Sequence, residues 1–183
     1  MNPVSEKKPS TRTLYKWITS GVCLALCMVL PFLTGQIPQI GKALSPMHIP
    51  VLICGLVCGW PYGLVVGLIA PILRSLTFGM PPLFPTASAM AFELAAYGVF
   101  SGLLWKCLPK KVWALYAALI GAMLSGRLVW GLAMLLLLGI SGSAFTFSAF
   151  LAGAFVNAVP GIICHIVLIP PIVLGLNRAG LRP

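Results

Sequence analysis

The sequence predicts an all-α membrane protein with six transmembrane helices and both termini in the cytoplasm. Of the 183 residues, 60% are hydrophobic and 8% are charged, whereas soluble domains have about 45–50% apolar and about 25% charged residues. The chain has 12 lysine and arginine residues but only 2 acidic ones, which gives a net charge of +10. Long apolar runs alternate with short segments that contain the basic residues, which is typical of chains that cross a bilayer several times.

This composition excludes several classes of function. A water-soluble enzyme would need more charged side chains to cover its core. The two acids are Glu6 and Glu93, and there is no aspartate. Glycosidases and magnesium sites held by aspartates depend on acidic residues that this chain lacks. A membrane explains the positive charge better than nucleic acid does, because lysine and arginine gather on the cytoplasmic side of membrane proteins. We therefore expect a lipid bilayer as surroundings and no nucleic-acid partner.

The expected spans follow from the apolar runs, because a bilayer core about 30 Å thick takes about 20 apolar helical residues. Pro61 separates the second span, which is short, from the third. An alternative with five spans and a re-entrant second helix stays open for that reason. The six expected spans cover residues 17–34, 47–60, 61–78, 87–107, 112–138 and 147–176.

The basic residues favour an even number of spans. With six spans, Lys42 is the only one on the outer side, and nine others share the opposite side, which the positive-inside rule makes cytoplasmic. The chain is then one membrane domain, residues 17–176, between cytoplasmic tails of residues 1–16 and 177–183, and a multi-pass protein of the cell membrane. The nine are Lys7, Lys8, Arg12, Lys16, Lys106, Lys110, Lys111, Arg178 and Arg182.

Small residues four positions apart predict close contacts between helices, because they let backbones approach in lipid. One such series crosses Pro61, and a shorter one lies on the fourth span. On the first span, Gly21 and Ala25 form a further pair, whose face meets a partner protein or an internal helix. The six cysteines are expected to pack as small apolar side chains, without a metal. The two series are Gly55, Gly59, Gly63 and Gly67, and Gly98 with Gly102.

Charged side chains within spans are the first candidates for a functional site, because they cost several kcal/mol unless paired or hydrated. At 1.5 Å per residue, Arg74, Glu93, Arg127 and Asn157 all reach the outer half of the membrane. We expect these four to converge in one pocket.

Helical spacing adds neighbours to this predicted pocket. Tyr97 shares the face of Glu93, and Trp130 that of Arg127. His48 lies beside the first outer loop, residues 35–46, and is expected in the site or its lid. This loop and the segment 80–86 are rich in proline and apolar, which suits segments that fold over a ligand. His165 is expected to be a hydrogen-bonded packing residue.

The charges of the predicted pocket indicate the kind of ligand. Arg74 and Arg127 against Glu93 leave one positive charge, and an unpaired charge in a low-dielectric site is costly. A ligand with one carboxylate would neutralise it through bidentate hydrogen bonds to arginine. In the alternative interpretation, both arginines share Glu93, or Arg74 extends to the outer headgroups.

Three segments of the sequence resemble a known family. Gly41-Lys42-Ala43-Leu44-Ser45-Pro46-Met47-His48-Ile49-Pro50-Val51 leads into the glycine series, and Arg74-Ser75-Leu76-Thr77-Phe78-Gly79-Met80-Pro81-Pro82 and Ala91-Phe92-Glu93-Leu94-Ala95-Ala96-Tyr97-Gly98 follow. Together they resemble the substrate-binding S-components of energy-coupling factor (ECF) vitamin transporters, over most of the chain.

The resemblance implies an S-component-like bundle that binds a vitamin in an outer pocket formed by the outer loops and the last three helices. It also implies a membrane coupling protein and two ATPase subunits as partners, together forming an ABC importer. An Ala-xxx-Ala face on the first helix commonly meets the coupling protein in this family, and Gly21 with Ala25 is the nearest match here. The chain has no Walker motif, so we expect no enzymatic activity and no cofactor, with ATP used by the partners.

The substrate is expected to be pantothenate, since the sequence looks closest to that branch, with lipoate and niacin as other monocarboxylates. Neutral ligands such as pyridoxine or a pyrimidine precursor are favoured instead if Glu93 already neutralises the arginines. The alternative function is a stand-alone secondary transporter of a small organic solute. A purely structural membrane subunit is a further alternative, and it would bind no ligand.

Overall fold

The computed structural model describes residues 11–33, 44–140 and 146–178, and these residues form helices without any strand. The expected outer loop 35–46 lies largely outside this range, as do Lys42 and most of both tails. The helices are α1 (Thr11–Leu33), α3 (His48–Cys58), α4 (Trp60–Phe78), the π-helical η1 (Leu83–Ala87), α5 (Ser88–Cys107), α6 (Val112–Ile140), α7 (Phe147–Ala154), the 3-10 turn η2 (Val156–Ala158) and α8 (Val159–Arg178).

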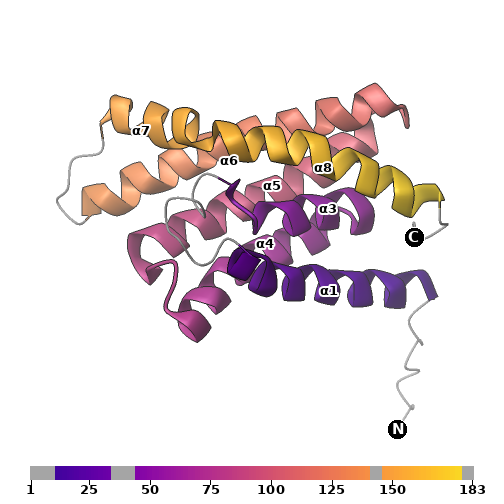
Figure 1. The fold of residues 1–183 in the computed structure, drawn as a ribbon, viewed down its shortest axis with the longest axis horizontal. Coiled ribbons are helices and arrows are strands. Elements are labelled where there is room, and N and C mark those ends of the chain that lie inside the picture. The colour runs from indigo at the N-terminus through magenta and orange to yellow at the C-terminus, as the bar shows by residue number, and fades with distance from the viewer. Residues whose placement is uncertain (1–10, 34–43, 141–145, 179–183) are drawn as a thin grey trace, which may run out of the picture.

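Within the described residues, five helical stretches are long and apolar enough to cross a membrane. The exception among the predicted spans is α3, whose 11 residues extend about 16 Å, or about half of a bilayer core. The start of α1 and the end of α8 nevertheless lie at the same end of the bundle (Figure 1). Five crossings alone would place these two helix ends at opposite ends of the bundle, so the half-length helix α3 accounts for their common position. The count of six full spans stays a prediction.

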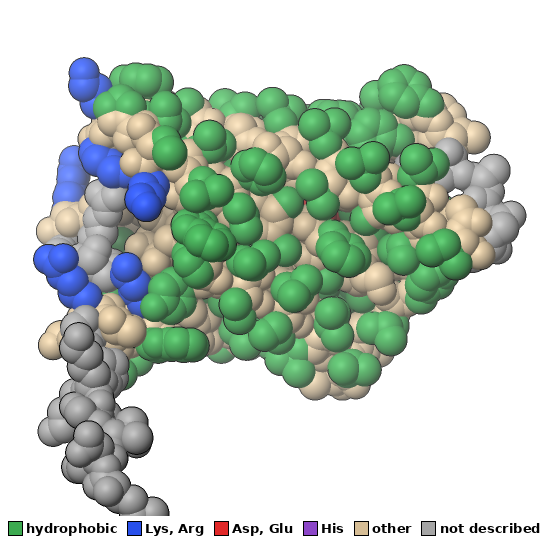
Figure 2. Space-filling view, turned by 180° about the vertical axis from the view of Figure 1, so that it is seen from behind, with side chains coloured by type: hydrophobic (Ala, Val, Ile, Leu, Met, Phe, Trp, Pro, Cys, Tyr) green, Lys and Arg blue, Asp and Glu red, His purple; other side chains and the backbone are tan. Residues whose placement is uncertain are grey.

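Charge and apolar surface are separated along the long axis of the molecule. Lysine and arginine side chains gather at one end, and hydrophobic side chains are spread over the middle of the visible face (Figure 2). We call this the basic end. The helix α1 begins at Thr11, inside the predicted tail of residues 1–16, so Arg12 and Lys16 continue the helix beyond its apolar part. Such a distribution suits a bilayer around the middle of the molecule, with headgroups beside the charges.

The central helix α5 packs against α3, α4 and α6 (Figure 1). Glycines allow these close contacts, as the four-residue spacing predicted. A methyl group added at Gly63 would overlap the backbone of Gly98, and one at Gly67 would overlap the backbone of Leu94. At Gly59 the reason is different, because its φ of 101° turns the chain between α3 and α4 and is accessible mainly to glycine. A methyl group at Gly55 of α3 would also overlap the backbone of Gly98, so three helix backbones are in direct contact in the core.

The predicted sixth span, residues 147–176, is not one continuous helix. It is divided into α7 and α8 by the short turn η2. Pro160 lies in the first turn of α8, where its missing N–H and its ring interrupt a regular helix on the preceding side. This break changes which side chains face the core on either side of it.

Candidate functional site

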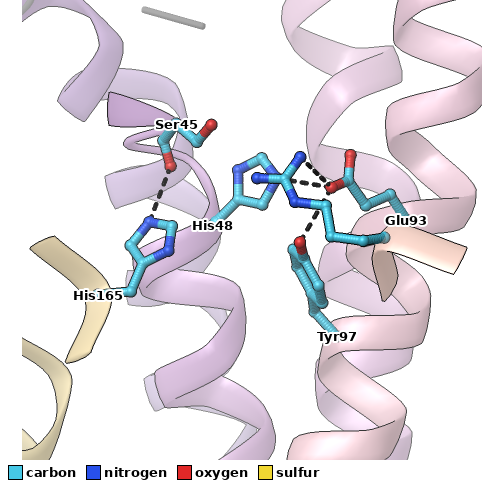
Figure 3. A network of polar contacts seen from close by, with 6 residues as sticks. Ser45, His48, Glu93, Tyr97 and His165 are labelled. Atoms are coloured by element: carbon cyan, nitrogen blue, oxygen red, sulfur yellow. Dashed lines mark hydrogen bonds and ion pairs between the residues drawn. The ribbon is translucent and has the colours of Figure 1, made fainter. Parts of the chain in front are cut away.

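A buried group of polar side chains surrounds Glu93 in the middle of the bundle. The Glu93 side chain is only 2% exposed. Its Oε1 atom lies 2.9 Å from Nη1 of Arg127 and accepts a hydrogen bond of 3.0 Å from the Tyr97 hydroxyl. The same oxygen lies 3.5 Å from Nε2 of His48 (Figure 3). We call His48, Glu93, Tyr97, Arg127 and His165 the Glu93 cluster.

Helix geometry explains how α5 and α6 contribute to this cluster. Glu93 and Tyr97 are four residues apart on α5, so they share one face. Arg127 extends from α6, which packs against that face. Beside it, Gly126 leaves room for the Tyr97 ring, because a methyl group there would overlap the ring carbons. The helices α5 and α6 thus hold a carboxylate, a guanidinium and a hydroxyl group together, away from water.

The start of α3 brings the third side of the cluster. His48 is the first residue of this half-length helix, and Pro50 in its first turn is compatible with a helix start. Ser45 adopts a left-handed conformation with a φ of 46°, which costs roughly 1–2 kcal/mol for a residue with a side chain. Its carbonyl accepts the His48 backbone N–H at 3.0 Å. Strained residues of this kind persist where the surrounding structure fixes them, and they cluster at binding sites.

The helix α8 closes the fourth side through His165, which is 1% exposed. Its Nε2–H donates to the Ser45 carbonyl at 3.4 Å (Figure 3). The rings of His165 and His48 stack at 5.8 Å between centroids, with 20° between their planes. His165 is therefore buried and hydrogen-bonded, as the sequence predicted.

The electrostatics of the cluster differ from the predicted excess of one positive charge. The charges of Glu93 and Arg127 cancel, and His48 and His165 add none when neutral. Three buried polar atoms in this cluster have no hydrogen-bond partner, namely both ring nitrogens of His48 and Nε of Arg127. Of these, Nε2 of His48 faces Glu93 Oε1 at 3.5 Å. Buried polar atoms are normally paired, so Nδ1 of His48 and Nε of Arg127 are available to a polar ligand.

The structure places Arg74 elsewhere, and the expected convergence is wrong for this residue. Its Nη1 donates to the Met28 carbonyl of α1 at 2.5 Å. Its guanidinium lies over the rings of Phe32 and Phe78, at 4.9 and 5.2 Å from their centroids. Neither sharing of Glu93 nor extension to the headgroups describes it. Residue depth along a helix gives the height of a side chain, but it does not determine which neighbour the side chain faces.

The expected convergence is also wrong for Asn157, whose side chain is exposed. The prediction assumed one continuous helix through residue 157. The 3-10 turn η2 interrupts the helix at this point, so the side chain of residue 157 does not face the direction that a continuous helix would give it. Trp130 lies on α6 one turn beyond Arg127, and it stacks on Phe150 of α7 at 6.5 Å. Gly153 of α7 leaves room for the Trp130 ring. Trp130 therefore joins α6 to α7 in an aromatic contact beside the cluster.

The predicted docking pair on α1 is accessible. Gly21 and Ala25 are both exposed, and a methyl group added at Gly21 would meet no atom within 4 Å. Cys23 and Cys27 on the other face are buried, and the Cys27 thiol donates to the Met47 carbonyl at 3.5 Å. The described residues contain no group of three or more histidine, cysteine or acidic side chains that could hold a metal ion.

Two contributors to the cluster were not predicted from the sequence. Ser45 acts through its backbone carbonyl, and nothing in its side chain indicates a left-handed conformation. Gly126 contributes because it has no side chain and so leaves room for the Tyr97 ring. Its place next to Arg127 in the sequence was the one sign that could have indicated this role. His48, Glu93, Tyr97 and Arg127 were predicted as site residues, and the structure brings these four together.

Comparison with known proteins identifies the family. The family model described as ECF transporter, substrate-specific component, matches residues 16–173, a range that includes the Glu93 cluster and the exposed face of α1. Searches of the curated proteins and of the solved structures find no significant match. The match extends over most of the sequence, and the several apolar helices agree with it. This chain therefore belongs to the family of substrate-specific components of ECF transporters, which are multi-pass membrane subunits of transport complexes.

Proposed function

We propose that this protein binds a small vitamin-like solute at the Glu93 cluster as the S component of an ECF-type ABC importer in the cell membrane. In this proposal a membrane coupling protein and two ATPase subunits complete the importer, and the ATPases use the ATP. The observation that carries the proposal is the buried, charge-balanced cluster, built from the start of α3, from α5, α6 and α8, in which polar atoms of His48 and Arg127 lack hydrogen-bond partners.

The cluster favours a ligand that is neutral where it contacts these side chains. Arg127 Nε is a donor and requires an acceptor, whereas His48 Nδ1 serves either role according to its tautomer. Satisfying such buried atoms contributes roughly 1–3 kcal/mol each. Because Glu93 already balances Arg127, the argument for a ligand carboxylate at this point no longer holds. Hydroxyl, amide or ring-nitrogen groups fit better.

Pantothenate stays the first candidate, because its hydroxyl and amide groups are neutral and its carboxylate can lie away from the cluster. Pyridoxine is the main neutral rival, followed by lipoate and niacin as monocarboxylates. Mass spectrometry of the small molecule released from the purified protein identifies a bound ligand directly. Thermal unfolding with each of these compounds gives a second readout, since a ligand at 100 times its Kd stabilises by about 2.7 kcal/mol. Absence of a co-purified ligand together with no stabilisation by any compound would contradict the proposal.

The variant His48→Ala tests whether the cluster is the binding site. We expect at least a tenfold loss of ligand affinity, equivalent to about 1.4 kcal/mol, because the ring that bridges Glu93 and His165 is removed. Isothermal titration with the identified ligand measures the change. Asn157→Ala serves as the control, since this side chain is exposed. Equal affinities for His48→Ala and the control would remove His48 from the pocket.

The variants Gly21→Leu and Ala25→Leu test docking separately. They should leave ligand affinity unchanged and impair ATP-dependent uptake in vesicles that contain the coupling protein and ATPases, because a bulky side chain prevents close approach of another helix. Gly139→Leu on α6 is the matched control, since a side chain there also meets no atom within 4 Å. Uptake by this protein alone, driven by an ion gradient without ATPases, would replace the proposal with the secondary-transporter alternative.

A further inference from the structure

A second polar site lies at the basic end of the bundle. A cavity of about 350 Å³ opens there between the end of α5, the start of α6 and the end of α8. Its polar lining consists of Lys110, Lys111, Asn177 and Arg178. On α5, its lining residue Trp105 lies twelve residues beyond Glu93, which is about 18 Å along the helix axis. This cavity, which we call the basic pocket, is therefore separate from the Glu93 cluster.

The basic pocket has a strong excess of positive charge. Its lining includes three cationic side chains and no acidic one. The ammonium group of Lys110 lies 4.4 Å from the centre of the Trp105 ring and donates to the Trp105 carbonyl. The N-terminus of α6 at Val112 adds a partial positive charge, and Arg178 offsets the partial negative charge at the C-terminus of α8. The site therefore suits an anion with several acceptor oxygens.

Apolar surface continues from this pocket. Val112 and Leu174 complete its lining. On α8, Val167 and Ile163 precede Leu174 by two and three turns on the same face, and both are exposed. On α6, Ile120 is exposed about two turns beyond Val112. The pocket includes the end of α8, which lies at the same end of the bundle as the start of α1 (Figure 1). A free anion in water would contact only the polar part, whereas a lipid would contact both.

We propose that the basic pocket binds the phosphate headgroup of an anionic phospholipid, whose acyl chains lie along the apolar surfaces of α6 and α8. Lys111 and Arg178 contact the phosphate oxygens, and Lys110 remains over Trp105 at the edge of the pocket. Basic pockets between membrane helices recognise anionic headgroups in this way. The proposal concerns the leaflet at the basic end and does not depend on which ligand the Glu93 cluster binds.

Native mass spectrometry of the full-length protein tests the proposal, with phosphatidylglycerol or phosphatidylcholine added to the micelles. The variant Lys110→Gln/Lys111→Gln/Arg178→Gln removes the pocket cations. Lys7→Gln/Lys8→Gln/Arg12→Gln removes the same charge from the N-terminal region and is the matched control. We expect the pocket variant to bind phosphatidylglycerol at least tenfold more weakly than the control, because the control keeps the local site. Phosphatidylcholine should show no such difference.

A second variant separates a shaped pocket from a generally positive surface. Val112→Trp keeps every charge and fills part of the cavity, so it should also weaken phosphatidylglycerol binding, and a thermal scan confirms that it is folded. Equal binding by the pocket variant and the control would overturn the proposal, as would unchanged binding by Val112→Trp. Inorganic phosphate provides the last arm, because protection against unfolding by millimolar phosphate to the same extent as by the lipid would assign the pocket to a soluble anion instead.

Discussion

The two buried arginines of this protein show two ways to keep a cation inside a membrane helix bundle. Arg127 is paired with a carboxylate, and its neighbours include a tyrosine and two histidines from other helices. Arg74 is paired with a neutral backbone carbonyl of α1, and two phenylalanine rings cover its guanidinium. Both side chains are more than nine-tenths buried. The rule that charged residues within spans are candidates for a functional site selects both arginines and does not distinguish between them.

The difference lies in what remains when each arginine is removed. Loss of Arg127 leaves Glu93 as a buried anion without its main counter-ion. Loss of Arg74 leaves a carbonyl group, which is neutral and keeps part of its helix hydrogen bonding. Buried charges are much more expensive to leave unpaired than neutral groups. We therefore assign Arg127 to the polar site and Arg74 to the attachment of α1 to α4.

The largest expected effect is that of Arg127→Ala. We expect a loss of about 3–5 kcal/mol in the free energy of unfolding, because the partner charge stays buried. Glu93→Gln/Arg127→Gln should recover most of this loss, since it leaves no net charge. Chemical denaturation in detergent measures both. A double variant no more stable than Arg127→Ala would show that the two residues do not interact as a pair.

Gly126→Ala tests how tightly the polar site is packed. The added methyl group overlaps the ring of Tyr97, so the ring must move and its hydrogen bond to Glu93 must weaken. We expect a destabilisation of about 1–3 kcal/mol, the usual cost of overpacking. Gly139→Ala on the same helix meets no atom within 4 Å and should be neutral. If both variants have the same thermal midpoint, the close contact between Tyr97 and α6 is not maintained in the membrane protein.

Arg74→Met tests the other side of the comparison. It keeps the apolar stem and removes one charged hydrogen bond to Met28, so we expect a destabilisation of about 1–2 kcal/mol. Ligand affinity should change by less than about twofold, or less than about 0.4 kcal/mol. Thermal unfolding and calorimetric titration of the same preparation measure the two effects. A tenfold loss of affinity would return Arg74 to the ligand site and restore the predicted positive excess.

Asn157→Ala is expected to have the smallest effect. The side chain is exposed in the turn between α7 and α8, and exposed substitutions usually change stability by less than about 0.5 kcal/mol. Unfolding and ligand titration should both match the unmodified protein. A clear loss of affinity would mean that this turn folds inwards when ligand binds.

The helix positions could be predicted closely from the sequence because apolar run length and turn residues act locally. The predicted spans at 61–78 and 87–107 differ by one residue from α4 and α5. The prediction failed where two helices meet or where one is interrupted. Pro160 gave a local sign of the break before α8, but the resulting rotation of Asn157 depends on how α7 packs against α6.

The candidate site could be predicted in part for a similar reason. Glu93 and Tyr97 share a face of one helix, so their proximity follows from spacing. The pairing of Glu93 with Arg127 required only that two charges in spans find each other. The position of Arg74 depended instead on the backbone carbonyl of Met28 on α1, and no sequence pattern indicates which carbonyl will accept a hydrogen bond.

The contacts of Gly63 and Gly67 with α5 have a consequence for how this protein can move. Where main chains touch, no intervening rotamers can adjust, so α4 and α5 cannot slide past each other gradually. We therefore expect α4 and α5 to move as one rigid unit in any rearrangement of the bundle. Covalent cross-links between α4 and α5 should consequently leave turnover intact.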